Sequence, residues 1–139
     1  MADGLVEFLR ARLDEDERTA YAADDSLGKV NLDWVYRPEG ELGGKVASAR
    51  GADLIPDVLG GVGKHVAVHD PRRVLAEVDA KRQIVQAYED AVAAFNDSGP
   101  ALSSYDRLTG SVSSLRRTVE ALARPYAGHP DYRADDWRP

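Results

Sequence analysis

The clearest regular pattern along the chain is an apolar seam between His69 and Phe95. Apolar side chains recur there at intervals of three and four residues, which places them on one face of a helix. Asp70 suits the N-cap position, and Pro71 suits the first helical position, where its missing N–H costs nothing. The pattern therefore predicts one long helix over residues 71–95.

Two further stretches carry the same helical period. Apolar residues between Leu5 and Leu13 share one face, which predicts a helix over residues 3–23 with Asp3 as its cap. A second seam, which ends at Tyr126, predicts a helix over residues 101–123. Because only a short turn separates this last helix from the previous one, we expect the two to pack as an antiparallel hairpin, with the first helix across it.

Between the first two predicted helices the period changes from helical to alternating. Residues 30–36 alternate between apolar and polar side chains, which is typical of a half-buried strand. Residues 45–49 can return as its partner, and residues 54–55 are predicted to form a short edge strand because a proline follows them. The alternating stretch HVAVH, residues 65–69, predicts another strand. We therefore expect a small antiparallel sheet within residues 30–69.

Together these patterns predict an α+β fold of three helices with a small sheet inserted after the first. The length of 139 residues suits one domain, residues 1–139, whose tail at 125–139 is held to the body by its aromatic side chains. No cysteine is present, which excludes disulfides and thiolate metal sites. No apolar run approaches the ~20 residues that cross a bilayer, so we expect a cytoplasmic protein without a membrane partner.

Three blocks of the sequence resemble a family of small proteins of unknown function from actinobacteria, mainly Streptomyces, and their phages. The blocks read LDEDE near the start, HDPRRVLAEVDAKR in the middle and PYAGHPDYRADDWRP at the end. The chain departs from the usual family pattern at Val68, Arg124 and Gly128, where arginine, leucine and aspartate are common. The resemblance implies an actinobacterial or phage origin, and it implies no established activity.

The residues that could carry chemistry gather near the three histidines. His69, His129 and Asp131 are candidate catalytic residues for general acid–base chemistry. His65, His69, His129 and Glu15 are candidate metal ligands. Two histidines four residues apart chelate a metal readily on a helix, but on the predicted strand they would lie roughly 13 Å apart. The simpler interpretation is that His69 packs or hydrogen-bonds near the start of the long helix.

Two other motifs argue against nucleotide and nucleic-acid binding. The stretch GGVGK, residues 60–64, lacks the glycine and the serine or threonine that a phosphate-binding loop needs, because Val58 and His65 stand at those positions. We therefore expect a flexible connection there.

Basic residues on the two long helices are interleaved with acidic ones, and the net charge is −6, so nucleic acid is not the expected partner.

These observations favour a non-enzymatic interaction or accessory protein that needs no cofactor. Its expected partner is another protein or a second copy of the chain, in a homodimer formed through the helical hairpin. The alternative is a metal-binding or hydrolytic protein that uses a histidine and carboxylate cluster. A third, less favoured interpretation is a nucleic-acid-associated regulator.

Overall fold

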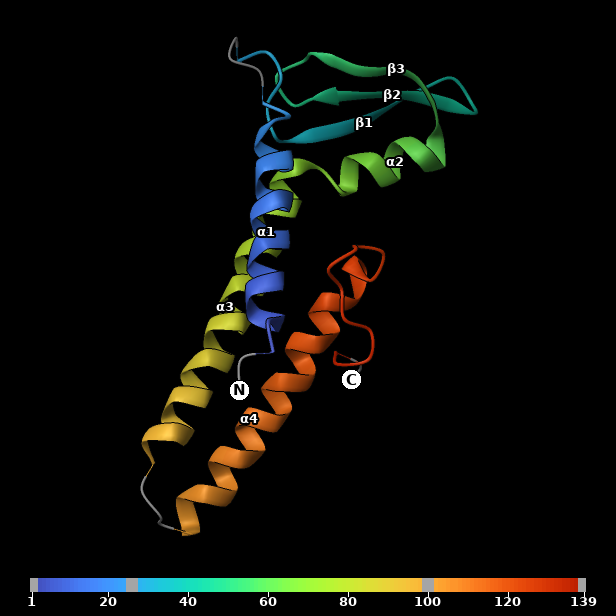
Figure 1. Cartoon of the computed structure of the whole chain (residues 1–139). Coiled ribbons are helices and arrows are strands. Elements are labelled where there is room, and N and C mark those ends of the chain that lie inside the picture. Colours follow the sequence, from blue (N-terminus) through green and yellow to red (C-terminus); the bar gives the residue numbers. More distant parts are fainter. Residues whose placement is uncertain (1–2, 25–27, 99–101, 138–139) are drawn as a thin grey trace. The chain divides into compact units, whose positions relative to one another are not determined.

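The structure is a computed structural model that describes residues 3–24, 28–98 and 102–137. Its elements in chain order are α1 (Leu5–Tyr21), β1 (Trp34–Glu39), β2 (Gly43–Ser48), β3 (Asp53–Leu59), α2 (Gly60–Val68), α3 (Pro71–Asp97), α4 (Leu102–Ala123) and the short 3₁₀ helix η1 (Arg124–Tyr126) (Figure 1). The predicted α+β class is confirmed, although the described residues form four α-helices instead of the expected three. None of the described helices is both long enough and apolar enough to cross a membrane.

Contacts divide the chain into two compact units. The helical unit comprises Met1–Leu13 and Asp79–Pro139, and the sheet unit comprises Asp14–Val78. Helices α1 and α3 each contribute residues to both units. The single domain expected from the length of the chain stays a prediction.

The core of the helical unit combines three helices and the C-terminal tail. Leu5 and Leu9 of α1 cluster with Val85 of α3, Val119 of α4 and Trp137 of the tail, and each side chain is almost completely buried. Full burial of an aliphatic side chain contributes roughly 1.5–3 kcal/mol, so this cluster is a major source of stability for the unit. The apolar faces predicted for α1, α3 and α4 thus meet in one core, with α1 at its centre.

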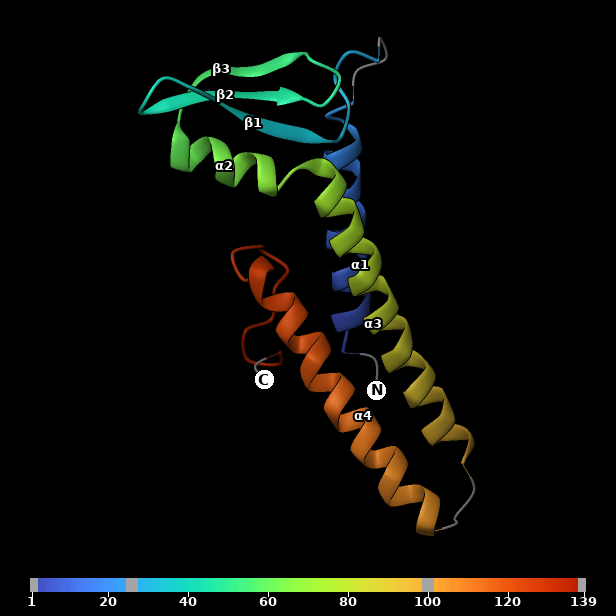
Figure 2. The same ribbon diagram turned by 180° about the vertical axis from the view of Figure 1, so that it is seen from behind.

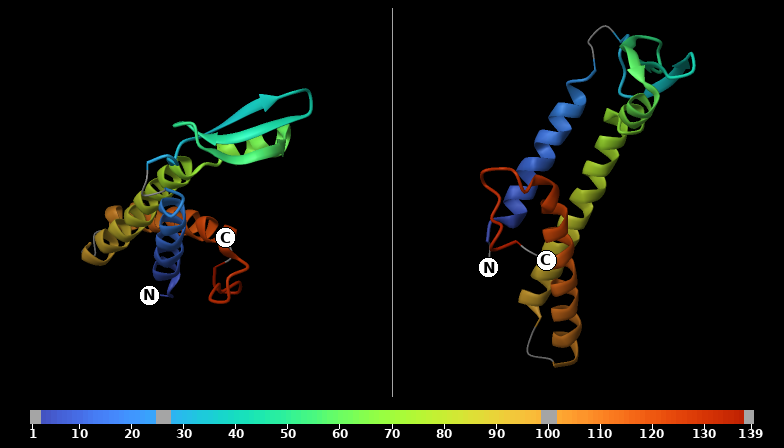
Figure 3. Two further views of the ribbon diagram at one scale, coloured as in Figure 1. Left: turned by 90° about the horizontal axis from the view of Figure 1, so that it is seen from above. Right: turned by 90° about the vertical axis from the view of Figure 1, so that its right-hand side faces the viewer.

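Aromatic contacts hold the tail against α1, as predicted. The ring of Phe8 lies 4.9 Å from that of Trp137 and 6.0 Å from that of Tyr132, measured between centroids. Figure 3 shows the tail folding back from the end of α4 toward the first turns of α1. The aromatic side chains of the tail therefore cover the part of the core that α1 contributes.

Helices α3 and α4 contact each other where α3 ends and α4 begins. The rings of Phe95 and Tyr105 lie 5.5 Å apart there. The predicted helix over residues 101–123 is confirmed from Leu102 onward, and Ala101 lies outside the described residues. The long continuous seam expected between these two helices stays a prediction.

Charged contacts link the start of α1 to α4. A carboxylate oxygen of Asp3 accepts a hydrogen bond from the N–H of Leu5 at 3.1 Å, which supports its predicted role as a cap. Arg116 pairs with Asp3 and also with Glu120. Burial acts to raise the pKa of Asp3, but the Arg116 guanidinium and the Leu5 N–H together lower it.

The sheet unit contains an antiparallel sheet in the order β1-β2-β3, and α2 lies against one of its faces (Figures 1 and 2). Gly63 allows a close approach of α2 to the sheet, because a Cβ atom there would lie only 2.5 Å from Cδ2 of Tyr36.

A charged cluster joins the three strands. Lys45 Nζ on β2 lies 3.2 Å from a carboxylate oxygen of Asp53 on β3 and 3.4 Å from one of Glu39 on β1.

Two predictions for residues 60–69 are wrong. The expected flexible connection at 60–64 and most of the expected strand at 65–69 form the helix α2 instead, and His69 is its C-cap. Glycines and valines favour helix weakly, so the local sequence does not indicate this helix, and packing against the sheet stabilises it. The first strand begins at Trp34 and not at residue 30. The predicted strand at 45–49 is confirmed up to Ser48, where β2 ends, and the predicted strand at 54–55 is confirmed within β3.

Candidate functional site

The predicted candidate residues do not form one site within either unit. His65, His69 and the exposed Glu15 belong to the sheet unit, whereas His129 and Asp131 belong to the helical unit. Within residues 3–24, 28–98 and 102–137, no group of three or more histidine and carboxylate side chains could hold a metal ion. The catalytic roles proposed for His69, His129 and Asp131 stay predictions.

His129 is engaged by the protein around its ring. The backbone N–H of Asp131 donates to Nδ1 at 3.1 Å, and the Arg12 guanidinium contacts Nε2. The ring also meets Phe8 edge to face, with 5.7 Å between centroids. These contacts place His129 among the groups that fix the tail to α1, and each of its ring nitrogens already has a protein partner.

His65 and His69 lie side by side, contrary to the expectation that they are far apart on a strand. Their ring centroids are 4.3 Å apart, and the ring planes differ by 29°. The reason is that a helix brings residues four positions apart onto the same face. The argument that these two side chains cannot share a metal ion is therefore wrong.

Asp70 joins the start of α3 to the first strand. One of its carboxylate oxygens accepts from the N–H of Arg73 at 2.9 Å, and the other accepts from the N–H of Trp34 at 3.0 Å. The residue is only 3% exposed. The predicted N-cap is thus confirmed, and the same carboxylate anchors the beginning of β1 at the point where α2 ends.

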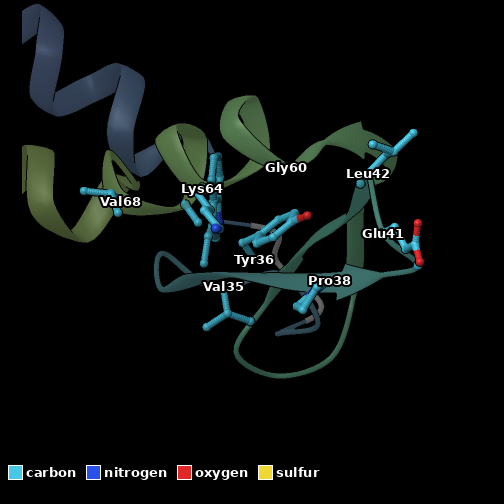
Figure 4. Close-up of a pocket in the computed structure, with 12 residues that line it drawn as sticks. Val35, Tyr36, Pro38, Glu41, Leu42, Gly60, Lys64 and Val68 are labelled. Atoms are coloured by element: carbon cyan, nitrogen blue, oxygen red, sulfur yellow. The ribbon is translucent and has the colours of Figure 1, made fainter.

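A groove of about 680 Å³ lies between β1 and α2. The residues that line it are Trp34, Val35, Tyr36, Pro38, Gly40, Glu41, Leu42, Gly43, Gly60, Lys64, Ala67 and Val68. Figure 4 shows the Tyr36 ring between the strand and the helix, with Lys64 reaching from α2 toward the strand and Val35 on the opposite side of β1. The volume falls within the ~300–1,000 Å³ of typical ligand sites.

The backbone of β1 offers hydrogen-bonding groups along this groove. The N–H of Ala49 donates to the carbonyl of Asp33 at 2.8 Å, just before the strand begins. In an antiparallel pair, residues that face the partner strand alternate with residues that face away. The regular register of β1 on β2 therefore turns the N–H and carbonyl of Tyr36, and the carbonyls of Trp34 and Pro38, toward the open edge. The N–H of Trp34 is already bonded to Asp70. Proline is tolerated at such a position because no ladder hydrogen bond is lost.

The other edge of the sheet is protected. Its strand, β3, has register irregularities against β2, whereas β1 pairs with β2 without any. Such bulges discourage a further strand from pairing. Proline and charge do not distinguish the two edges, because both β1 and β3 contain a proline and two charged residues. The edge at β1, which pairs regularly over its whole length, is the edge better suited to receive another strand.

Large apolar side chains are exposed around the groove. Leu42 is 84% exposed and Val68 is 54% exposed, and both line it. Leu59 and Val62, nearby in the chain, are 69% and 54% exposed. Exposed apolar side chains that gather in one region indicate an interaction surface more strongly than single ones. The sequence did not indicate this groove because the residues of its second wall, α2, were predicted as a flexible connection and a strand.

The chain belongs to a family of unknown function (DUF6221), which it matches over residues 2–139. This match agrees with the resemblance of the three sequence blocks to a family of unknown function. No curated protein and no solved structure matches the chain. The chemistry of the groove and of the side chains around it is therefore the basis for a functional proposal.

Proposed function

We propose that this protein is a non-enzymatic interaction module that binds an extended segment of a partner protein in the groove between β1 and α2. The bound segment adds to the sheet as a strand beside β1. Main-chain hydrogen bonds supply affinity in this mode of recognition, and pockets for alternate side chains supply specificity. The observation that carries the proposal is the open backbone edge of Tyr36 and its neighbours, which runs along an apolar groove.

The chemistry of the lining defines the class of segment that fits. The groove favours apolar side chains on the face of the segment that enters it, because its lining includes Trp34, Tyr36, Leu42 and Val68. Side chains alternate along a strand, so those apolar residues should occur at every second position. Lys64 reaches from α2 toward the strand and favours an acidic residue in the segment. The occupant is therefore an extended, alternating apolar segment with an acidic side chain.

The proposal extends to the setting in which the protein works. The sequence resemblance supports an actinobacterial or prophage context, and the composition supports a cytoplasmic location. Self-association through the helical hairpin is less favoured, because Val85 and Val119 of its seam are already buried inside the helical unit. Pairing of β1 with β1 of a second copy would use the same edge and is an outcome that the experiment must distinguish.

The test is selection of peptides from a displayed random library on the purified full-length chain. The affinity of one enriched peptide is then measured for the wild type, Val68→Gln and Val62→Gln. Val62 and Val68 lie on α2 and are both 54% exposed, but only Val68 lines the groove. Glutamine is neutral, so it leaves the interaction with the helix dipole unchanged.

We expect the library to yield alternating apolar peptides whose affinity falls about tenfold or more in Val68→Gln, because about 1–2 kcal/mol of apolar contact is lost. The Val62→Gln control should bind as the wild type does. N-methylation of the peptide at every second residue should abolish binding, since those N–H groups pair with β1. Absence of enriched peptides, or equal loss in both variants, would contradict the proposal. A dimer in light scattering that Val68→Gln dissociates would instead identify a second copy as the occupant.

A further inference from the structure

The paired histidines at the end of α2 form a feature that the groove does not use. His65 lies within the helix and His69 is its C-cap, and both side chains are exposed. Their rings are stacked with 4.3 Å between centroids. Neither residue lines the groove, so their proximity needs a separate explanation.

One hydrogen bond determines which nitrogen of His69 is available. Nδ1 of His69 lies 3.0 Å from the carbonyl oxygen of His65. A carbonyl oxygen can only accept, so Nδ1 must carry the hydrogen. In the neutral ring Nε2 then holds the free lone pair. Histidines that bind metals commonly donate their other ring N–H to a backbone carbonyl, which fixes the tautomer and the ring orientation.

We propose that His65 and His69 together bind one divalent transition-metal ion. Two histidines spaced by four residues can converge on a single ion. The rings are stacked in this structure, so binding requires rotation of these exposed side chains until both in-plane lone pairs face the ion. The site lies at the C-terminal end of α2, where the helix dipole favours a positive charge. Imidazole nitrogens select zinc, copper or nickel and not magnesium or calcium, which prefer oxygen ligands. Water completes the coordination, because the pair supplies two ligands.

Calorimetric titration of the full-length chain with zinc, and separately with magnesium, tests this site. The variants are His65→Gln and His69→Gln, and His129→Gln is the matched control because His129 lies in the helical unit. Both members of the pair are exposed, so their replacement leaves the apolar core intact. Nitrogen NMR of the histidine rings in the wild type provides a second measurement that does not depend on any variant folding correctly.

We expect one zinc ion per chain and no binding of magnesium. Loss of an outer-shell partner commonly weakens metal binding by about tenfold or more, so loss of a direct ligand in either variant should cost at least that factor. The His129→Gln control should bind zinc as the wild type does, and zinc should shift the ring resonances of His65 and His69 alone. Unchanged affinity in either pair variant, loss of binding in His129→Gln, or no zinc-dependent shift of the pair would overturn the proposal.

Discussion

Most of the exposed large apolar side chains of the described residues lie in the sheet unit, although that unit also buries Val46 and Val78. In the helical unit, Leu5, Leu9 and Trp137 are at most 1% exposed. In the sheet unit, Leu42, Leu59, Val62 and Val68 are each more than half exposed. A protein gains stability by burying such groups, so those left in solvent indicate a surface that binds something else. The comparison assigns stability mainly to the helical unit and recognition to the sheet unit.

Both units contain ion pairs between residues that are far apart in the chain, and in the sheet unit Arg72 pairs with Asp33 at 3.7 Å. The helical unit joins its elements with ion pairs that link distant parts of the chain, such as Arg116 with Asp3 and Arg10 with Glu89. In the sheet unit, Lys45 sits between Asp53 and Glu39, which raise the pKa of its ammonium group in that order. This cluster joins neighbouring strands and does not reach the groove. The groove wall is therefore mainly apolar, as binding of an apolar segment requires.

The largest expected effect is that of Trp137→Ala in the helical unit. Removing this buried ring from its contact with Phe8 should lower the free energy of unfolding by about 3–5 kcal/mol. Urea denaturation followed by circular dichroism measures the change. The comparison variant Leu42→Ala, in the sheet unit, should cost no more than about 0.5 kcal/mol because the side chain is already in solvent. Similar losses in the two variants would contradict the contrast between the units.

A smaller effect is expected from Gly63→Ala in the sheet unit. The new Cβ would lie 2.5 Å from the Tyr36 ring and 2.8 Å from Cγ1 of Val58. Such overpacking costs about 1–3 kcal/mol and outweighs the gain of up to ~1 kcal/mol in helix propensity. In the control Gly61→Ala the new Cβ meets no atom within 4 Å, so this variant should be neutral or more stable. Thermal unfolding of both variants makes the comparison, and a stabilised Gly63→Ala would show that α2 does not pack closely on Tyr36.

The smallest expected effect concerns Asp3 and the pH dependence of stability. Asparagine caps a helix as well as aspartate does, so Asp3→Asn removes mainly the ion pair with Arg116, worth about 0.2–1 kcal/mol. The pKa of Asp3 is lowered from its usual value of 3.8 by folding. Its contribution is therefore fully present above that value, and it is lost as the pH falls through the lower pKa of the folded state.

Denaturation curves of the wild type and Asp3→Asn, measured between neutral pH and pH 2, test this prediction. The wild type should be the more stable protein at neutral pH, and the difference should shrink as the pH falls below about 4. A difference that stays constant across this range would show that the carboxylate charge of Asp3 does not contribute.

The sequence by itself determined the elements whose signals are local. Apolar periods predicted α1, α3 and α4, and the caps at Asp3 and Asp70 were read from residue type and position alone. Alternation and turn residues predicted the paired strands of the sheet. These predictions succeeded because a helix or strand with one apolar face records in its own period which side will be buried.

Only the tertiary structure decided the conformation of residues 60–69 and everything that depends on it. Three glycines and the alternating HVAVH stretch carry little helix propensity, so no local signal distinguishes α2 from a loop and a strand. The helix is stabilised where Gly63 lets it pack against the Tyr36 ring on another element. The packing of α2 on the sheet creates the groove beside β1 and brings His65 next to His69. The spacing of apolar residues within 60–69 does not predict this packing.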